Sequence, residues 1–191
     1  MSDAHLILAS ASPRRLALLA QIGVVPDAVV ATAVDESPLG EELPRAHAVR
    51  MARAKAAACT RPEQYVLAAD TVVAVGRRIL GKTDDEPTAR RFLGLLSGRR
   101  HRVITCVVLV APGGKSAERV VESDVTFARL ETARIDAYLA RGEWRGKAGG
   151  YAIQGFAAAF VRHVGGSYSG MVGLPLFETA QLLRGLGYPL P

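Results

Sequence analysis

An apolar run near the start of the chain ends in hydroxyl side chains and two arginines. Ser10 and Ser12 follow the run, and after one proline come Arg14 and Arg15. Ser12 suits the N-cap of a helix and the proline suits its first position, which places both arginines in the first turn. That turn is already positive, so two cations there are favourable chiefly when an anion binds from outside. The pattern predicts either an anion site or a solvated helix start with two surface arginines.

A carboxylate interrupts a second apolar run. Asp70 lies in the middle of Val66–Val75, and Thr71 follows it. A buried ionised carboxylate is normally paired, bound to metal or protonated. Asp70 is therefore predicted to be either a functional acid or the structural partner of a nearby cation, whereas Thr71 on its own is an ordinary strand residue.

The segment Gly76–Thr83 matches the P-loop pattern letter for letter and follows a predicted strand. A true P-loop turns directly into a helix that holds phosphate, but here three acidic residues, 84–86, follow and would repel it. The bulky residues between the glycines suit a short hairpin strand better. We therefore expect no P-loop, although Lys82 can bind phosphate as a point charge.

Three further positions carry groups that suit a ligand site. Lys55 lies on a small apolar face of a predicted helix, so it is either a snorkelling lysine or points toward a cleft. Asp35 and Glu36 follow the second predicted strand and either bind a divalent cation or solvate a loop, and the residues alone favour the loop. Gln154 lies in a glycine-rich stretch and could donate to and accept from a nucleobase edge, unless the stretch is a structural turn.

Alternating strand and helix patterns predict an α/β fold that positions these residues. The predicted strands are Leu6–Ala9, Ala28–Ala33, Tyr65–Val75, Val103–Ala111 and Val120–Phe127. The predicted helices are Pro13–Ile22, Pro44–Cys59, Pro87–Leu96, Thr132–Ala140 and Pro175–Leu186. Because Pro112–Gly114 joins the last two strands as an antiparallel hairpin, the sheet should be mixed.

Composition narrows the class of protein. The chain has 191 residues, of which 49% are hydrophobic, enough for a sizeable core. Cys59 and Cys106 stand alone, which indicates buried free thiols. The net charge of +6 admits a nucleic-acid partner, but the basic residues are dispersed and only 6% of residues are aromatic, so a small polyanionic substrate fits as well. With no signal peptide and no run near the ~20 apolar residues of a membrane span, we expect a cytoplasmic protein.

Taken together and in order, several motifs resemble the Maf family of nucleoside triphosphate pyrophosphatases, from Leu6 to about Leu186. They are Ser10–Arg15, Ala69–Val73, Gly81 with Lys82, Ser97 and Gly98 with His101 and Thr105, Gly149–Gly155, Gly166–Tyr168 and Val172–Leu176. The resemblance implies one Maf-like domain over residues 1–191. Its mixed α/β sheet would carry flanking helices and a deep cleft between two lobes, similar to inosine triphosphate pyrophosphatases.

The resemblance also implies an activity. Such enzymes cleave a nucleoside triphosphate to the monophosphate and pyrophosphate with a divalent cation, here Mg²⁺ or Mn²⁺. Asp70 would be the proton acceptor, a metal ligand together with Glu36, or both. The remaining substrate-binding residues would be Ser10, Ser12, Arg14, Arg15, Lys55, Thr71, Lys82 and Gln154.

Three of these residues predict the substrate. Arg14, Thr71 and Gln154 match the branch acting on dTTP and UTP, whereas the branch acting on methylated GTP typically has tryptophan, glutamine and glutamate there. Cellular roles in nucleotide-pool cleaning and control of division would follow, with no stable nucleic-acid or membrane partner and with a homodimer as an open option. The alternatives are a P-loop NTPase using Gly76–Thr83 and a basic nucleic-acid-binding regulator.

Overall fold

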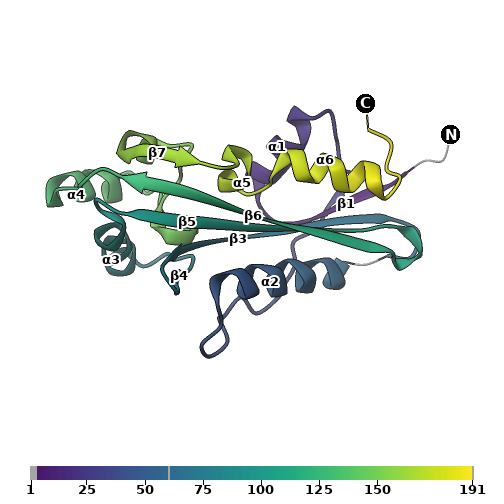
Figure 1. Ribbon diagram of the computed structural model, residues 1–191, viewed down its shortest axis with the longest axis horizontal. Coiled ribbons are helices and arrows are strands. Elements are labelled where there is room, and N and C mark those ends of the chain that lie inside the picture. The colour runs from purple at the N-terminus through teal and green to yellow at the C-terminus, as the bar shows by residue number, and fades with distance from the viewer. Residues whose placement is uncertain (1–3, 60, 191) are drawn as a thin grey trace.

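A long mixed sheet forms the centre of the protein in this computed structural model (Figure 1). The structure describes residues 4–59 and 61–190, so the ends of the predicted 1–191 unit lie outside the described residues. The strands are β1 (Leu6–Ala9), β2 (Ala28–Val29), β3 (Tyr65–Val75), β4 (Arg78–Leu80), β5 (Arg100–Val110), β6 (Ser116–Phe127) and β7 (Val161–Gly165). Their order is β2-β1-β3-β5-β6-β7, and β4 pairs with β3. Since β1 is parallel to β2 and β3 while the other pairs are antiparallel, the predicted mixed sheet is confirmed.

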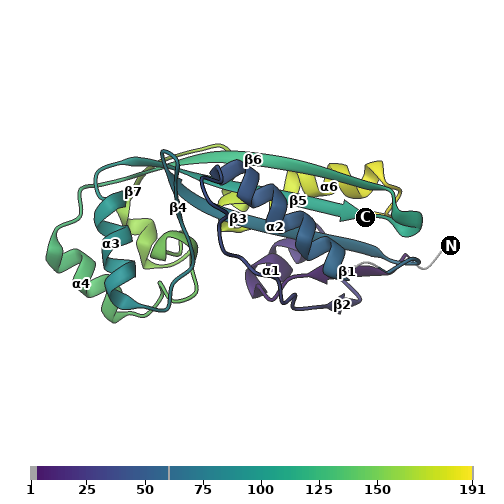
Figure 2. The same cartoon turned by 90° about the horizontal axis from the view of Figure 1, so that it is seen from below.

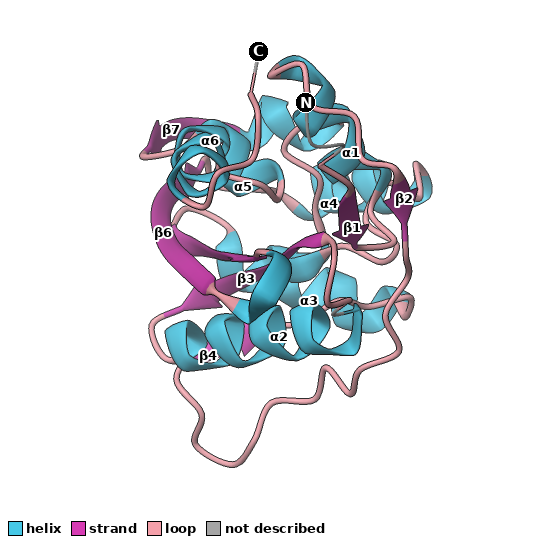
Figure 3. Cartoon of the chain, turned by 90° about the vertical axis from the view of Figure 1, so that its right-hand side faces the viewer, coloured by secondary structure: helices cyan, strands magenta, loops and turns pink. Residues whose placement is uncertain are grey.

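Helices cover both faces of this sheet (Figures 1 and 3). They are α1 (Pro13–Gln21), α2 (Pro44–Cys59), α3 (Glu86–Leu96), α4 (Thr132–Ala140), α5 (Tyr168–Val172) and α6 (Leu176–Gly185), with short 3₁₀ turns at Pro112–Gly114, Ala148–Gly150 and Phe156–Phe160. Helix α2 packs on β3 and β5 from one side, while α5 and α6 pack on the sheet from the other. Because both faces are covered, β3 is apolar at successive positions, with Val66 in the core under α2 and Leu67 in the opposite core.

Strand β3 is long enough to take two different partners along one edge. Its first part pairs with β1 up to Ala68, and its last part pairs with β4 from Val73 onward. Between them lie residues 69–72, which have β5 on one edge and, among the described residues, no strand on the other. We call residues 69–72 the open edge of β3. Helices α1 and α2 lie toward one end of the molecule, and α3 and α4 form the other (Figure 2).

Several sequence predictions change in detail. Strand β2 is two residues long rather than reaching Ala33, and its pairing with β1 ends where Leu8 faces Val29. Strands β5 and β6 begin earlier than predicted, and β7 and α5 were not predicted at all. Ser12 is at the N-cap of α1, but its side chain makes no capping hydrogen bond.

The predicted absence of a P-loop is confirmed. Residues Arg78–Leu80 form β4, a hairpin strand antiparallel to β3, and the next helix begins only at Glu86 after an Asp85 N-cap. Both cysteines are buried and free, as predicted. In residues 4–59 and 61–190, no helix combines the length and the apolar character needed to span a membrane.

Candidate active site

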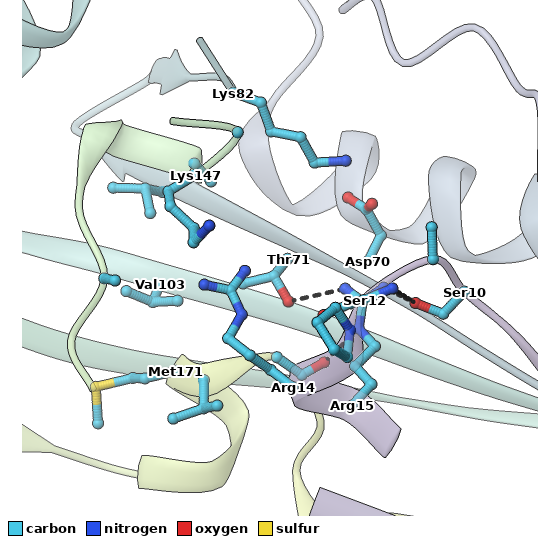
Figure 4. A pocket seen from close by; sticks show the side chains of 18 of the residues that line it. Ser10, Ser12, Arg14, Arg15, Asp70, Thr71, Lys82, Val103, Lys147 and Met171 are labelled. Atoms are coloured by element: carbon cyan, nitrogen blue, oxygen red, sulfur yellow. Dashed lines mark hydrogen bonds between the residues drawn. The ribbon is translucent and has the colours of Figure 1, made fainter. Parts of the chain in front are cut away.

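A cavity of about 450 Å³ opens beside the open edge of β3, within the size range of small-ligand sites (Figure 4). Its lining comes from the start of α1, the loop after β2, helix α2, strands β3 and β5, the segment after β4, the glycine-rich segment 146–154 and the end of α5. It includes every residue that the sequence predicts for the site: Ser10, Ser12, Arg14, Arg15, Glu36, Lys55, Asp70, Thr71, Lys82 and Gln154. Asp35 is not among the lining residues, and its carboxylate accepts a hydrogen bond from the backbone N–H of Ser37.

On the α2 side of the sheet, two carboxylates and two lysines form a continuous ion-pair chain. The Lys55 Nζ lies 2.5 Å from Asp70 Oδ1 and 2.7 Å from Glu36 Oε1. The Lys82 Nζ donates to the other Glu36 oxygen, Oε2, at 2.6 Å. Lys55 and Asp70 are each only 5% exposed. Asp70 is therefore the partner of a cation, which is one of the two alternatives, and it also lines the cavity.

The chain of charges fixes the protonation state of Glu36. Desolvation alone would raise the pKa of this carboxyl group, but hydrogen bonds and charge from Lys55 and Lys82 outweigh it and bring the pKa to about 2. Glu36 is therefore ionised at neutral pH.

Glu36 lies in an irregular loop that Arg50 of α2 holds in place. The Arg50 guanidinium donates to Glu42 Oε1 at 2.7 Å through Nε and to the Ser37 carbonyl oxygen at 2.9 Å through Nη2. The Glu42 carboxylate in turn accepts from the backbone of Leu39 at 3.1 Å. This network anchors the loop to α2 next to Glu36, which reaches the cavity.

The two carboxylates fit a divalent cation. Asp70 and Glu36 each present an oxygen to the same ammonium group, so they converge on one point. Mg²⁺ is commonly held by one or two carboxylates, with water and substrate phosphate completing the shell. Within the described part of the chain, no cluster of three or more histidine, cysteine, aspartate or glutamate side chains could hold a metal by itself. The donor set suits a cation that arrives with substrate oxygens.

On the opposite side of the sheet, Arg15 is held by neutral oxygens. Its Nε donates to the Gly173 carbonyl at 2.8 Å, Nη1 to Ser10 Oγ at 3.0 Å and Nη2 to Thr71 Oγ1 at 3.4 Å. Within the described residues, no carboxylate forms an ion pair with Arg15. Desolvation lowers the pKa of Arg15, and the charge of Asp70 opposes this shift. A desolvated guanidinium held in place without its own carboxylate is suited to bind a ligand anion.

Thr71 is part of a hydrogen-bond chain that supports this arginine. The Thr105 hydroxyl lies 3.0 Å from Thr71 Oγ1 and 2.8 Å from the Gly170 carbonyl oxygen. Since a carbonyl only accepts and a hydroxyl has one proton, Thr105 donates to Gly170 and Thr71 donates to Thr105. The lone pair of Thr71 Oγ1 then faces Arg15. Thr71 therefore orients the guanidinium, a role the sequence pattern did not show.

The remaining part of the cavity is largely apolar. Val73, Val103, Met171, Val172 and Ile153 line it. Tyr151 also lines this part, and its hydroxyl is 2.8 Å from Nε2 of the buried His101. Gln154 also lines the cavity, and its side chain is exposed. An apolar surface with an amide at its rim suits a nucleobase.

Lys147 lines the cavity as well, although the sequence did not single it out. Its ammonium group and the Arg14 guanidinium project toward each other from opposite sides (Figure 4). Burial lowers the pKa of Arg14, and it also lowers the pKa of Lys147, with a further contribution from the Arg14 charge. The available signal was the position of Lys147 between glycines, which indicates close backbone approach but not where the side chain points.

The chain is similar to several known proteins. A dTTP/UTP pyrophosphatase of Gluconobacter oxydans is 63% identical over 187 residues, 94% of this chain and 86% of that protein. A dTTP/UTP pyrophosphatase of Rhodospirillum rubrum is 60% identical over 189 residues, 98% of this chain and 90% of that protein. The solved nucleoside-triphosphatase, or dITP/XTP pyrophosphatase, of Mycobacterium abscessus aligns with 66% of this chain and 74% of its own, at 20% identity and a TM-score of 0.41. A family model described as Maf-like protein matches residues 5–186, and the chain therefore belongs to the Maf-like protein family.

Proposed function

We propose that this protein hydrolyses dTTP and UTP to the nucleoside monophosphate and pyrophosphate. The observation that carries the proposal is the division of one cavity into two parts. One part holds Asp70 and Glu36 among lysines, and the other is apolar with Gln154 at its rim. The names of the 60–63% identical relatives support the same substrates.

The polyphosphate would lie at the charged part of the cavity. Arg15 and Lys82 are cations that line it, and the Ser10 and Ser12 hydroxyls add uncharged donors. A triphosphate carries about four negative charges, so it needs several cations to bind with its charge offset. Asp70 and Glu36 would hold a Mg²⁺ or Mn²⁺ ion, which when bound adds positive charge where the leaving pyrophosphate becomes more negative.

Asp70 would take the proton of the attacking water. Lys55 occupies its Oδ1 at 2.5 Å and so fixes the orientation of the carboxylate, which leaves Oδ2 to accept a proton. The water oxygen forms a bond to the α-phosphorus, and the bond from that phosphorus to the oxygen bridging to the β-phosphorus breaks. The products are the monophosphate and pyrophosphate, and the proton passes through Asp70 to solvent.

The base would lie on the apolar part of the cavity with its edge toward Gln154. Uracil and thymine present a carbonyl and an N–H side by side, which an amide pairs with as donor and acceptor. Arg14 lies between this part and the phosphate part (Figure 4).

A nucleotide panel tests the proposal. Each nucleoside triphosphate is incubated with Mg²⁺ or Mn²⁺, and pyrophosphate and orthophosphate are measured separately. We expect pyrophosphate release with dTTP and UTP as the best substrates. In Asp70→Asn, turnover should fall by about two orders of magnitude or more while the far-ultraviolet circular dichroism spectrum stays unchanged. Orthophosphate release would contradict the proposed cleavage, and salt-dependent DNA binding without turnover would favour the nucleic-acid regulator.

A further inference from the structure

The backbone around Lys147 is fixed against the segment that carries Lys82. Gly146 N donates to the Thr83 carbonyl oxygen at 3.0 Å, and Gly149 N donates to the Gly81 carbonyl oxygen at 3.2 Å. These two hydrogen bonds enclose Lys147 on both sides. Gly149 also has a φ of 71° and approaches β3 so closely that an added Cβ would lie 2.8 Å from a methyl carbon of Val73. Lys147 thus reaches the cavity from a rigidly placed backbone.

The ammonium group of Lys147 has no carboxylate partner in the described part of the chain. Its Nζ donates to the Arg145 carbonyl oxygen at 3.0 Å, a neutral acceptor. Burial and the neighbouring Arg14 charge both lower its pKa, and Asp84 opposes them weakly. Two cations that face each other across a cavity repel one another unless an anion lies between them. The arrangement is therefore incomplete without a negatively charged ligand.

The position of Lys147 in the cavity determines which part of a nucleotide it can reach. Figure 4 shows Lys147 and Arg14 between the apolar side chains of Val103 and Met171 and the polar end with Asp70 and Lys82. With a base on the apolar side and pyrophosphate at the polar end, the group at this boundary is the α-phosphate.

We propose that Lys147 binds the α-phosphate of the nucleotide, opposite Arg14, and remains bound to this phosphate in the monophosphate product. This inference rests on the proposed function for the orientation of the substrate. Segment 146–149 would then bind the α-phosphate through Lys147 in addition to packing against the segment that carries Lys82. The monophosphate product keeps the α-phosphate, whereas pyrophosphate contains only the β- and γ-phosphates. Binding of the two products therefore distinguishes a contact to the α-phosphate from contacts to the other phosphates.

Product binding tests this assignment without turnover. Isothermal titration calorimetry with Mg²⁺ measures UMP and inorganic pyrophosphate binding to the wild type, Lys147→Met and Lys147→Arg. The matched control is Lys115→Met, which removes an exposed lysine from the β5–β6 turn outside the cavity. We expect Lys147→Met to weaken UMP binding about tenfold, as for a lost charge-assisted hydrogen bond. It should change pyrophosphate binding by less than about twofold.

The arginine variant and the control separate charge from packing. Lys147→Arg should bind UMP within about threefold of the wild type, and Lys115→Met should bind both products unchanged. Unchanged UMP binding in Lys147→Met overturns the assignment. The assignment is also overturned if Lys147→Met loses the same affinity for UMP and for pyrophosphate, or if Lys147→Arg binds UMP as weakly as Lys147→Met. If Lys147→Met selectively loses UMP while the wild type releases no pyrophosphate from dTTP or UTP, the phosphate contact stands and the proposed function fails.

Discussion

Replacing Lys55 by methionine removes the ammonium group that joins Asp70 and Glu36, and it should lower the free energy of unfolding. The methionine keeps most of the apolar stem, so the change is chiefly one of charge. The side chains of Lys55 and Asp70 are 6% and 8% exposed, and their charged atoms are 2.5 Å apart. The variant therefore leaves a buried carboxylate without its cation.

The size of the effect follows from this burial. Removing one partner of a buried ion pair costs about 3–5 kcal/mol, because the remaining charge stays desolvated. Lys82→Met is the matched control, since Lys82 also pairs with Glu36 but its side chain is 52% exposed. An exposed pair contributes about 0–1 kcal/mol. The free energy of unfolding should therefore fall by roughly 3 kcal/mol more in Lys55→Met than in Lys82→Met.

Urea unfolding of four variants measures this difference. Besides the two lysine variants, Asp70→Asn and the double variant Lys55→Met/Asp70→Asn complete a double-mutant cycle. The double variant should be more stable than Lys55→Met alone, because it no longer buries an unpaired charge. In the absence of nucleotide, Mg²⁺ should also stabilise Lys55→Met more than the wild type, since the cation can then replace the missing ammonium charge between the two carboxylates. The reasoning is refuted if Lys55→Met loses no more stability than Lys82→Met, or if the two single effects simply add.

Two further predictions concern the base and the buried histidine. Gln154→Glu replaces an amide donor by a second acceptor, so kcat/KM for dTTP and UTP should fall by a factor equivalent to about 1–3 kcal/mol while GTP is affected less. Unchanged ratios among these substrates would remove Gln154 from base recognition. Burial lowers the pKa of His101 to about 4, below the usual value of 6.5. The unfolded state therefore binds a proton first as the pH falls, and unfolding free energy should drop by up to about 3 kcal/mol between pH 6.5 and 4. His101→Gln should flatten this slope, and an identical slope would contradict the assignment.

The sequence predicted the elements whose signals are local. Strands β1 and β3 are apolar runs with polar ends, and α1, α2 and α3 each begin at or next to a proline. Strand β7 was missed because its residues are exposed or half-buried and follow no apolar pattern. It exists because β6 extends far enough to pair with it, and the sequence shows no such contact between distant segments.

The site likewise has parts that local sequence signals predict and parts that depend on contacts between distant segments. Residue type was enough to identify Arg15, Asp70 and Lys82, since a cation or a carboxylate in those contexts needs a partner. Which partner each one has depends on the tertiary fold. Asp70 binds Lys55 across 15 residues of sequence, and Arg15 binds the Gly173 carbonyl across 158. The residues alone therefore left both a structural and a functional role open for Asp70.

The open edge of β3 explains how Asp70 and Thr71, whose side chains point to opposite faces of the sheet, both line one cavity. Successive side chains of a strand point to opposite faces, so Asp70 pairs with Lys55 of α2 while Thr71 contacts Arg15 of α1. In the middle of a sheet, these faces would be separated by the next strand. Here β1 has ended and β4 has not begun, so one ligand can pass the edge and contact both faces. Under the proposed function, the interruption in strand pairing would let the Asp70 carboxylate on one face and the Arg15 guanidinium on the other contact the same phosphate chain.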